Sequence, residues 1–171
     1  MIVLHPTFHP NFVQFLKEFN ETYDYFECHE VLEEYWKEVA PRRKVHPLTA
    51  LILVSTGMYH WRRGNFIGAI KTTSTSIDRL IESSNSPFFE TINYEKLLED
   101  VTTSLKLMKN ASTFQPFTIQ ITDKNLLTLV NNLKIDNCTD LHFLIHKHML
   151  RDRSEILKER EKSKKRRDER L

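Results

Sequence analysis

The stretch that decides the fold runs from Tyr25 to Ala40 and reads YFECHEVLEEYWKEVA. It holds no glycine or proline before Pro41, and Asp24 with Glu27 three residues later matches the capping box that opens helices. These features predict one uninterrupted helix. At 100° per residue, one largely apolar face of this helix also carries a histidine and a carboxylate; its members are Tyr25, Phe26, His29, Leu32, Glu33 and Trp36.

Helical patterns continue on both sides of this stretch. Pro10 suits a first helical position, and an i, i+3, i+4, i+7 apolar stripe follows it as far as Phe19. Residues 114–122 alternate apolar and polar side chains, which is compatible with a short strand or with an extended chain packed on helices. Further helices are predicted over residues 48–63, 66–84, 94–110 and 124–133, and from residue 140 into the C-terminus.

The composition agrees with a helical protein. Only three glycines stand against eleven phenylalanines in 171 residues, and 40% of the chain is hydrophobic, which excludes a disordered chain and disfavours an all-β fold. We therefore predict an all-α fold, a compact bundle of about five to seven helices. Residues 1–150 are expected to form one domain, followed by a charged C-terminal helical tail over residues 151–171, where the excess of basic residues lies.

The same inspection bears on location. No apolar run approaches the roughly 20 residues of a membrane span, and residues 1–10 have neither the basic nor the apolar part of a signal peptide. Cys28 and Cys138 are too few for a disulfide framework. We expect a cytoplasmic protein with no membrane association and no redox role.

The carboxylate on the apolar face of residues 25–40 needs partners, because burying it alone is costly. Glu33 is expected to meet His29, the indole of Trp36 or a group on a neighbouring helix. If the next helix packs antiparallel, residue counting brings His60 to within a turn of the level of His29. That next helix carries a small, partly polar stripe that can line a cavity: Thr49, Leu53, Thr56, Gly57 and His60.

Two imidazoles and a carboxylate form a plausible ligand set for zinc or another divalent ion. His29, Glu33 and His60 are the candidate ligands, and Glu30 is a candidate general base or fourth ligand. The metalloprotease motif His-Glu-x-x-His is absent, because Glu33 stands where that motif has its second histidine. No organic cofactor is indicated.

Two metal-free interpretations use the same residues. In one, histidine, glutamate and tryptophan form a buried hydrogen-bond network that fixes the helix packing. In the other, the histidines and glutamates line a polar pocket that Tyr25, Phe26 and Trp36 close. A structural network and a binding pocket are not distinguished by the spacing of these residues.

Three other features carry weaker chemical signals. Cys138, His142 and His146 recur every four residues, a spacing that can bind a metal on one helical face but also fits the edge of a core stripe. Cys28 points about 100° away from the histidine next to it and is interpreted as a small buried hydrophobe. The basic residues of 158–170 alternate with acids and lack aromatic neighbours, which favours a solvated helix over a nucleic-acid-binding arm.

Two blocks of the sequence resemble a known family. The first is residues 25–37, and the second combines Tyr59-His60, Arg63-Gly64-Asn65 and Gly68-Ala69. They are similar to the bacterial and archaeal family called domain of unknown function 309, and the resemblance covers about residues 20–85. It implies a small helical bundle without an assigned activity, and it places the family's two motifs on His29, Glu30, Glu33 and Trp36 and on His60, Gly64 and Asn65.

The sequence thus predicts a binding or interaction module with a polar His/Glu pocket. The sequence does not specify its partner, and a protein is the candidate. One alternative is a metal-dependent hydrolase that uses His29, Glu33 and His60. Another is an adaptor whose basic tail binds RNA or an acidic partner.

Overall fold

A computed structural model describes residues 4–135, 145–146, 161–162 and 164–166. None of the helices in these ranges is long and apolar enough to cross a membrane. The all-α prediction is confirmed, and the expected helix from residue 140 lies almost entirely outside the described residues. The elements are η1 (Pro6–Phe8), α1 (Pro10–Lys17), the π turn η2 (Glu18–Thr22), α2 (Tyr25–Val39), α3 (Pro47–Arg62), α4 (Phe66–Glu82), η3 (Pro87–Phe89), α5 (Tyr94–Lys109) and α6 (Lys124–Asn132).

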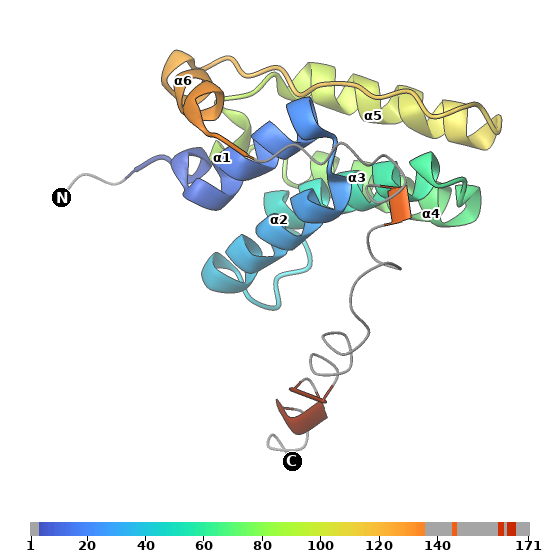
Figure 1. The fold of residues 1–171 in the computed structure, drawn as a ribbon, viewed down its shortest axis with the longest axis horizontal. Coiled ribbons are helices and arrows are strands. Elements are labelled where there is room, and N and C mark those ends of the chain that lie inside the picture. The colour runs from blue at the N-terminus through green and yellow to red at the C-terminus, as the bar shows by residue number, and fades with distance from the viewer. Residues whose placement is uncertain (1–3, 136–144, 147–160, 163, 167–171) are drawn as a thin grey trace.

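Helix α3 is the centre of the bundle (Figure 1). It packs against α2 on one side and α4 on another, while α1 lies on α2, α5 on α4 and α6 on α1. This position explains why α3 is apolar almost all round, as a helix surrounded by others must be. Its buried side chains include Leu48, Leu51, Val54, Met58 and Trp61.

Side-chain caps fix where the three central helices begin. Asp24 Oδ1 accepts the backbone N–H of Glu27 at 3.0 Å and so opens α2. His46 forms a capping box at the start of α3, and Asn65 Oδ1 accepts the N–H of Gly68 at 3.1 Å to open α4. Each cap satisfies a backbone donor that a helix N-terminus leaves without an intrahelical partner. The α2–α3–α4 double hairpin is therefore set by local sequence.

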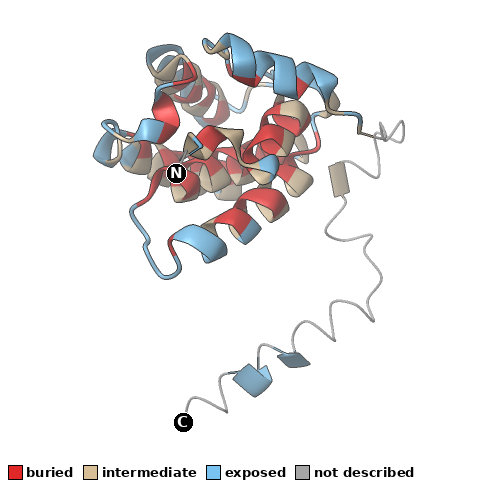
Figure 2. Cartoon of the chain, turned by 90° about the vertical axis from the view of Figure 1, so that its left-hand side faces the viewer, coloured by how far each residue is buried: buried red, intermediate tan, exposed pale blue. Residues whose placement is uncertain are grey.

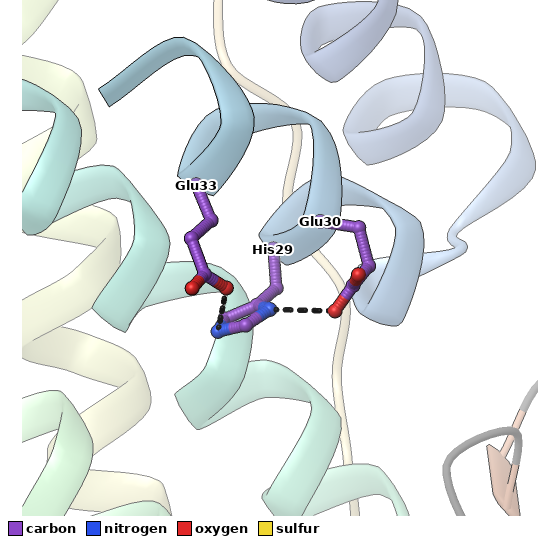
Figure 3. A group of neighbouring side chains, drawn as sticks. All are labelled: His29, Glu30 and Glu33. Atoms are coloured by element: carbon purple, nitrogen blue, oxygen red, sulfur yellow. Dashed lines mark hydrogen bonds and ion pairs between the residues drawn. The ribbon is translucent and has the colours of Figure 1, made fainter. Parts of the chain in front are cut away.

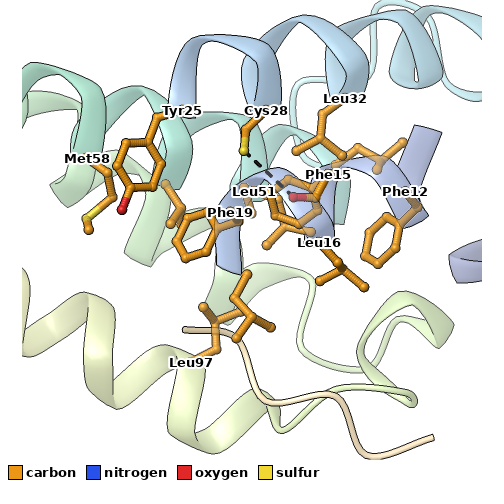
Figure 4. Packing of buried hydrophobic residues seen from close by; sticks show 14 of the residues in the cluster. Phe12, Phe15, Leu16, Phe19, Tyr25, Cys28, Leu32, Leu51, Met58 and Leu97 are labelled. Atoms are coloured by element: carbon orange, nitrogen blue, oxygen red, sulfur yellow. Dashed lines mark hydrogen bonds between the residues drawn. The ribbon is translucent and has the colours of Figure 1, made fainter. Parts of the chain in front are cut away.

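Aromatic side chains make up much of the core. Buried residues gather on the inward faces of the helices (Figure 2), and phenylalanines of α1 and η2 pack beneath α2 and α3 (Figure 4). Phe12 also contacts Phe88, with ring centroids 5.7 Å apart. The turn between α4 and α5 thus contributes Phe88, Phe89 and Ile92 to the core, although it has no periodicity that predicts their burial.

Two segments differ in detail from their predicted form. Helix α1 ends at Lys17 rather than reaching Phe19, because the chain widens into the π turn over Glu18–Thr22. Residues 114–122 are extended and form no strand, only an isolated bridge between Ile121 and Ile92. Ile119 is held by the side chain of Asn20, which accepts its N–H at 2.8 Å and donates to its carbonyl at 2.9 Å.

Candidate functional site

A small pocket opens between α2 and α3. Its volume is about 160 Å³, and its walls are almost entirely apolar. A cavity of roughly 150 Å³ is large enough for benzene, so this one accepts a single ring-sized group. The α2–α3 pocket is lined by Tyr25, Phe26 and His29 from α2 and by Thr56, Tyr59 and His60 from α3.

A tryptophan side chain is hydrogen-bonded to the loop that connects α2 and α3. The indole N–H of Trp36 donates to the backbone carbonyl of Arg43 at 2.9 Å. Trp36 is not among the residues that line the α2–α3 pocket, and its N–H is already used by the connecting loop. The structure therefore gives Trp36 a role in the hairpin; of the alternative donors to Glu33, the indole is not the one used, and Trp36 does not close the pocket.

Beside the pocket, His29 lies between two carboxylates of the same helix (Figure 3). Its Nδ1 is 3.2 Å from Glu30 Oε1, and its Nε2 is 3.6 Å from Glu33 Oε2. The three side chains offer one ligand atom each within 4.8 Å of one another. All three residues belong to α2. The i, i+4 spacing brings Glu33 to His29, whereas Glu30 is the adjacent residue, which helix spacing alone does not place against the imidazole.

Glu33 is less buried than the sequence pattern implied. Its side chain is 33% exposed, as is that of His29, while the side chain of Glu30 is 40% exposed. Glu33 Oε1 also receives an ion pair from Lys37 Nζ at 2.8 Å. The long glutamate side chain extends from the apolar face toward water, so its charge is not desolvated in the core.

His60 is in the pocket wall but not in the His29–Glu30–Glu33 cluster. Its Nδ1 lies 3.3 Å from Nδ2 of Asn65, the residue that caps α4. Burial, and then the positive charge of Arg63, lower the pKa of the His60 imidazole. Both causes disfavour the charged imidazolium, which suits an apolar wall.

Two arginines lie against the tyrosines of the pocket. The guanidinium carbon of Arg62 is 4.8 Å from the ring centroid of Tyr25, and that of Arg63 is 5.7 Å from the ring of Tyr59. Arg62 also donates to the Tyr23 carbonyl at 2.7 Å. Burial raises the pKa of the Tyr25 hydroxyl well above its ordinary value, although Arg62 opposes this shift. One pocket tyrosine from each helix thus has an arginine against its ring.

Tyr59 and Arg62 were not singled out by the reasoning from residue spacing. A signal for Tyr59 existed, because it follows Thr56 by three residues and therefore shares its side of α3. Arg62 had no comparable signal. Its contact with Tyr25 depends on how α2 and α3 pack, which helical periodicity alone does not specify.

The remaining predicted groups fall into two sets. Cys28 is fully buried, with Sγ 3.7 Å from the Phe15 carbonyl, and burial raises the pKa of its thiol, so its interpretation as a small hydrophobe is confirmed. Cys138 and His142 lie outside the described residues, as does most of the tail over residues 158–170.

Comparison with known proteins identifies the family of this chain. A family model described as "Domain of unknown function (DUF309)" matches residues 12–72. The chain is also 32% identical over 169 residues to "Uncharacterized protein YpuF" of Bacillus subtilis (strain 168), with 91% of this chain and 94% of that relative covered. The chain belongs to this family, which confirms the resemblance seen in the sequence. No solved structure matches it. Neither description specifies an activity, so the site must indicate the function.

Proposed function

We propose that this protein is a binding module and that the α2–α3 pocket is the place where its ligand is held. The observation that carries the proposal is the pocket itself: an apolar recess walled by Tyr25, Phe26 and Tyr59, next to a cluster of histidine and carboxylate side chains. Apolar walls beside a few placed polar groups are the usual composition of ligand sites. The recess holds one ring or one side chain rather than a large molecule.

A small aromatic probe tests the pocket directly. Titration of p-cresol into the isotope-labelled full chain, followed by NMR, should give saturable amide shifts centred on Phe26, Thr56 and His60. Thr56→Leu places a larger apolar side chain in the recess and should weaken this binding by about tenfold. Shifts that never saturate, or that lie elsewhere on the molecule, would contradict the proposal.

A matched variant controls for the loss of a threonine. The hydroxyls of Thr56 and Thr102 both donate to the carbonyl four residues earlier, at 2.9 and 2.7 Å. Thr102→Leu removes the same type of bond from α5 and should leave p-cresol binding unchanged. Equal weakening by Thr56→Leu and Thr102→Leu would mean that the effect comes from general destabilisation.

A second candidate function is supported by the separate cluster of His29, Glu30 and Glu33. We propose that these three side chains bind a divalent cation, because an imidazole and two carboxylates within 4.8 Å match the ligand preferences of zinc and manganese. Of the residues that the sequence-based prediction named, this set keeps His29, Glu33 and the candidate fourth ligand Glu30 and leaves out His60. Binding the cation would break the contacts that now join His29 to both carboxylates.

Calorimetric titration with Zn²⁺ and with Mn²⁺, together with elemental analysis of the purified protein, tests cation binding. One equivalent should bind to the wild type, and His29→Ala should abolish it. His9→Ala is the control, because His9 also faces a carboxylate, with Nε2 3.4 Å from Glu38 Oε2. Equal loss in both variants, or no uptake by the wild type, would refute this candidate.

A further inference from the structure

An acidic groove adjoins the α2–α3 pocket on the outer side of α2. Phe26 lines both features and joins them into one continuous surface. The groove carries four carboxylates and a single lysine, Lys37. We call these carboxylates the acidic row: Glu27, Glu30, Glu33 and Glu34.

The pocket and the acidic row favour different parts of one ligand. The pocket accepts an uncharged apolar group, because its walls are almost entirely apolar. A cationic occupant is disfavoured there, since Arg62 and Arg63 already lie against the tyrosine rings. The acidic row, in contrast, attracts positive charge and repels phosphate backbones and anionic lipid headgroups.

We propose that this surface docks a protein segment that carries one large apolar side chain, such as phenylalanine or leucine, next to lysines or arginines. The apolar side chain enters the α2–α3 pocket, and the basic residues lie along the acidic row. This inference rests on the proposed binding function and names the class of its ligand. The pocket selects the large apolar side chain of the segment. The carboxylates orient the bound segment and speed its association with the protein.

A fluorescein-labelled peptide with one central phenylalanine and lysines on both sides is the probe. Fluorescence anisotropy with the full chain, in the presence of EDTA, should show saturable binding. Replacing the phenylalanine by alanine should weaken binding by about tenfold or more, since a buried aromatic side chain contributes that much. Replacing the lysines by glutamates should abolish it. Equal affinity of the phenylalanine and alanine peptides would overturn the proposal.

Variants of the protein separate the contribution of the acidic row to peptide binding from that of the pocket. Glu30→Gln with Glu34→Gln should weaken the lysine peptide several-fold and make its binding less sensitive to salt. Glu95→Gln with Glu99→Gln is the control, because this exposed pair on α5 has the same four-residue spacing. Thr56→Leu should weaken the phenylalanine peptide but not the alanine peptide.

The two proposals fail differently. If p-cresol occupies the α2–α3 pocket and no peptide binds, the pocket is a ligand site and the partner class is wrong. If neither probe binds, both proposals fall. If the peptide binds and the Glu30/Glu34 double variant binds it equally well, charge complementarity is refuted.

Discussion

Gly57 of α3 lies so close to Thr73 of α4 that a methyl group on Gly57 would overlap Thr73 Oγ1. The two helices pack closely at this point because one of them has no side chain there. In an open helix, alanine is preferred to glycine by about 1 kcal/mol. At this contact the preference should be reversed.

We therefore predict that Gly57→Ala lowers the free energy of unfolding by about 1–3 kcal/mol, the usual cost of overpacking. Thr73→Ala removes the overlapping oxygen. Adding Gly57→Ala to the Thr73→Ala variant should therefore cost at most half of the free energy of unfolding that Gly57→Ala costs in the wild type. Urea denaturation of the four proteins checks the cycle. An unchanged or raised stability of Gly57→Ala would refute the close contact.

The hydrogen bond from Trp36 to the Arg43 carbonyl should protect the α2–α3 connection. Trp36→Phe keeps an aromatic ring but removes the N–H donor, at a cost of about 0.5–1.5 kcal/mol. Arg42, Arg43 and Lys44 are exposed, so trypsin cleavage in this loop should become faster, as followed by mass spectrometry.

Tyr94→Phe provides the control for this loop. It removes a comparable bond, from the Tyr94 hydroxyl to the Leu80 carbonyl at 2.7 Å, in another part of the bundle. It should lower stability without a selective effect on the loop. Equal acceleration of cleavage by both variants would argue against a local role of Trp36.

Stability should fall as the pH is lowered from about 7 to 5. Burial, together with Arg43 for His46 and Arg63 for His60, lowers the pKa of both imidazoles in the folded state. The unfolded chain then binds more protons below the ordinary histidine pKa of about 6.5, so the free energy of unfolding decreases with falling pH. His60→Gln should reduce this slope, as measured by urea denaturation across the range; an identical slope would contradict the assignment.

Ala111 adopts a left-handed backbone conformation with φ of 52° just after α5. Ala111→Gly should raise stability by about 0.5–1 kcal/mol, because glycine occupies this region without steric strain. The reciprocal test is Gly64→Ala, where φ is 82°, which should lower stability by a similar amount. Thermal unfolding compares the two, and a gain for both variants would be inconsistent with the backbone conformations.

How far the sequence predicts the site depends on whether an interaction is local. The contact of His29 with Glu33 follows from i, i+4 spacing on one helix and needed no tertiary information, whereas its contact with the adjacent Glu30 does not follow from spacing. The approach of His60 to His29 followed from counting along two antiparallel helices, and both residues do line one pocket. The partner of the Trp36 indole, in contrast, depends on the path of the loop after α2, which residue spacing does not describe.

The same distinction holds for the fold. Helices with clear periodicity and caps, such as α2 and α4, were predicted nearly to the residue. The π turn after Lys17 was missed, because it continues the apolar stripe while changing the hydrogen-bond step. Residues 114–122 alternate like a strand, yet Ile92 supplies a single bridge and no continuous neighbour to pair with.

All the residues that line the α2–α3 pocket belong to one helical hairpin, and this hairpin lies within the segment matched by the family model, residues 12–72. The later helices α5 and α6 pack on α4 and α1 instead. The pocket lining and the helices α5 and α6 therefore belong to separate parts of the chain. A lineage can lengthen, shorten or replace the chain after Phe114, which still contacts Tyr25, and keep the pocket lining intact, so diversification there need not change the hairpin that we propose as the binding site.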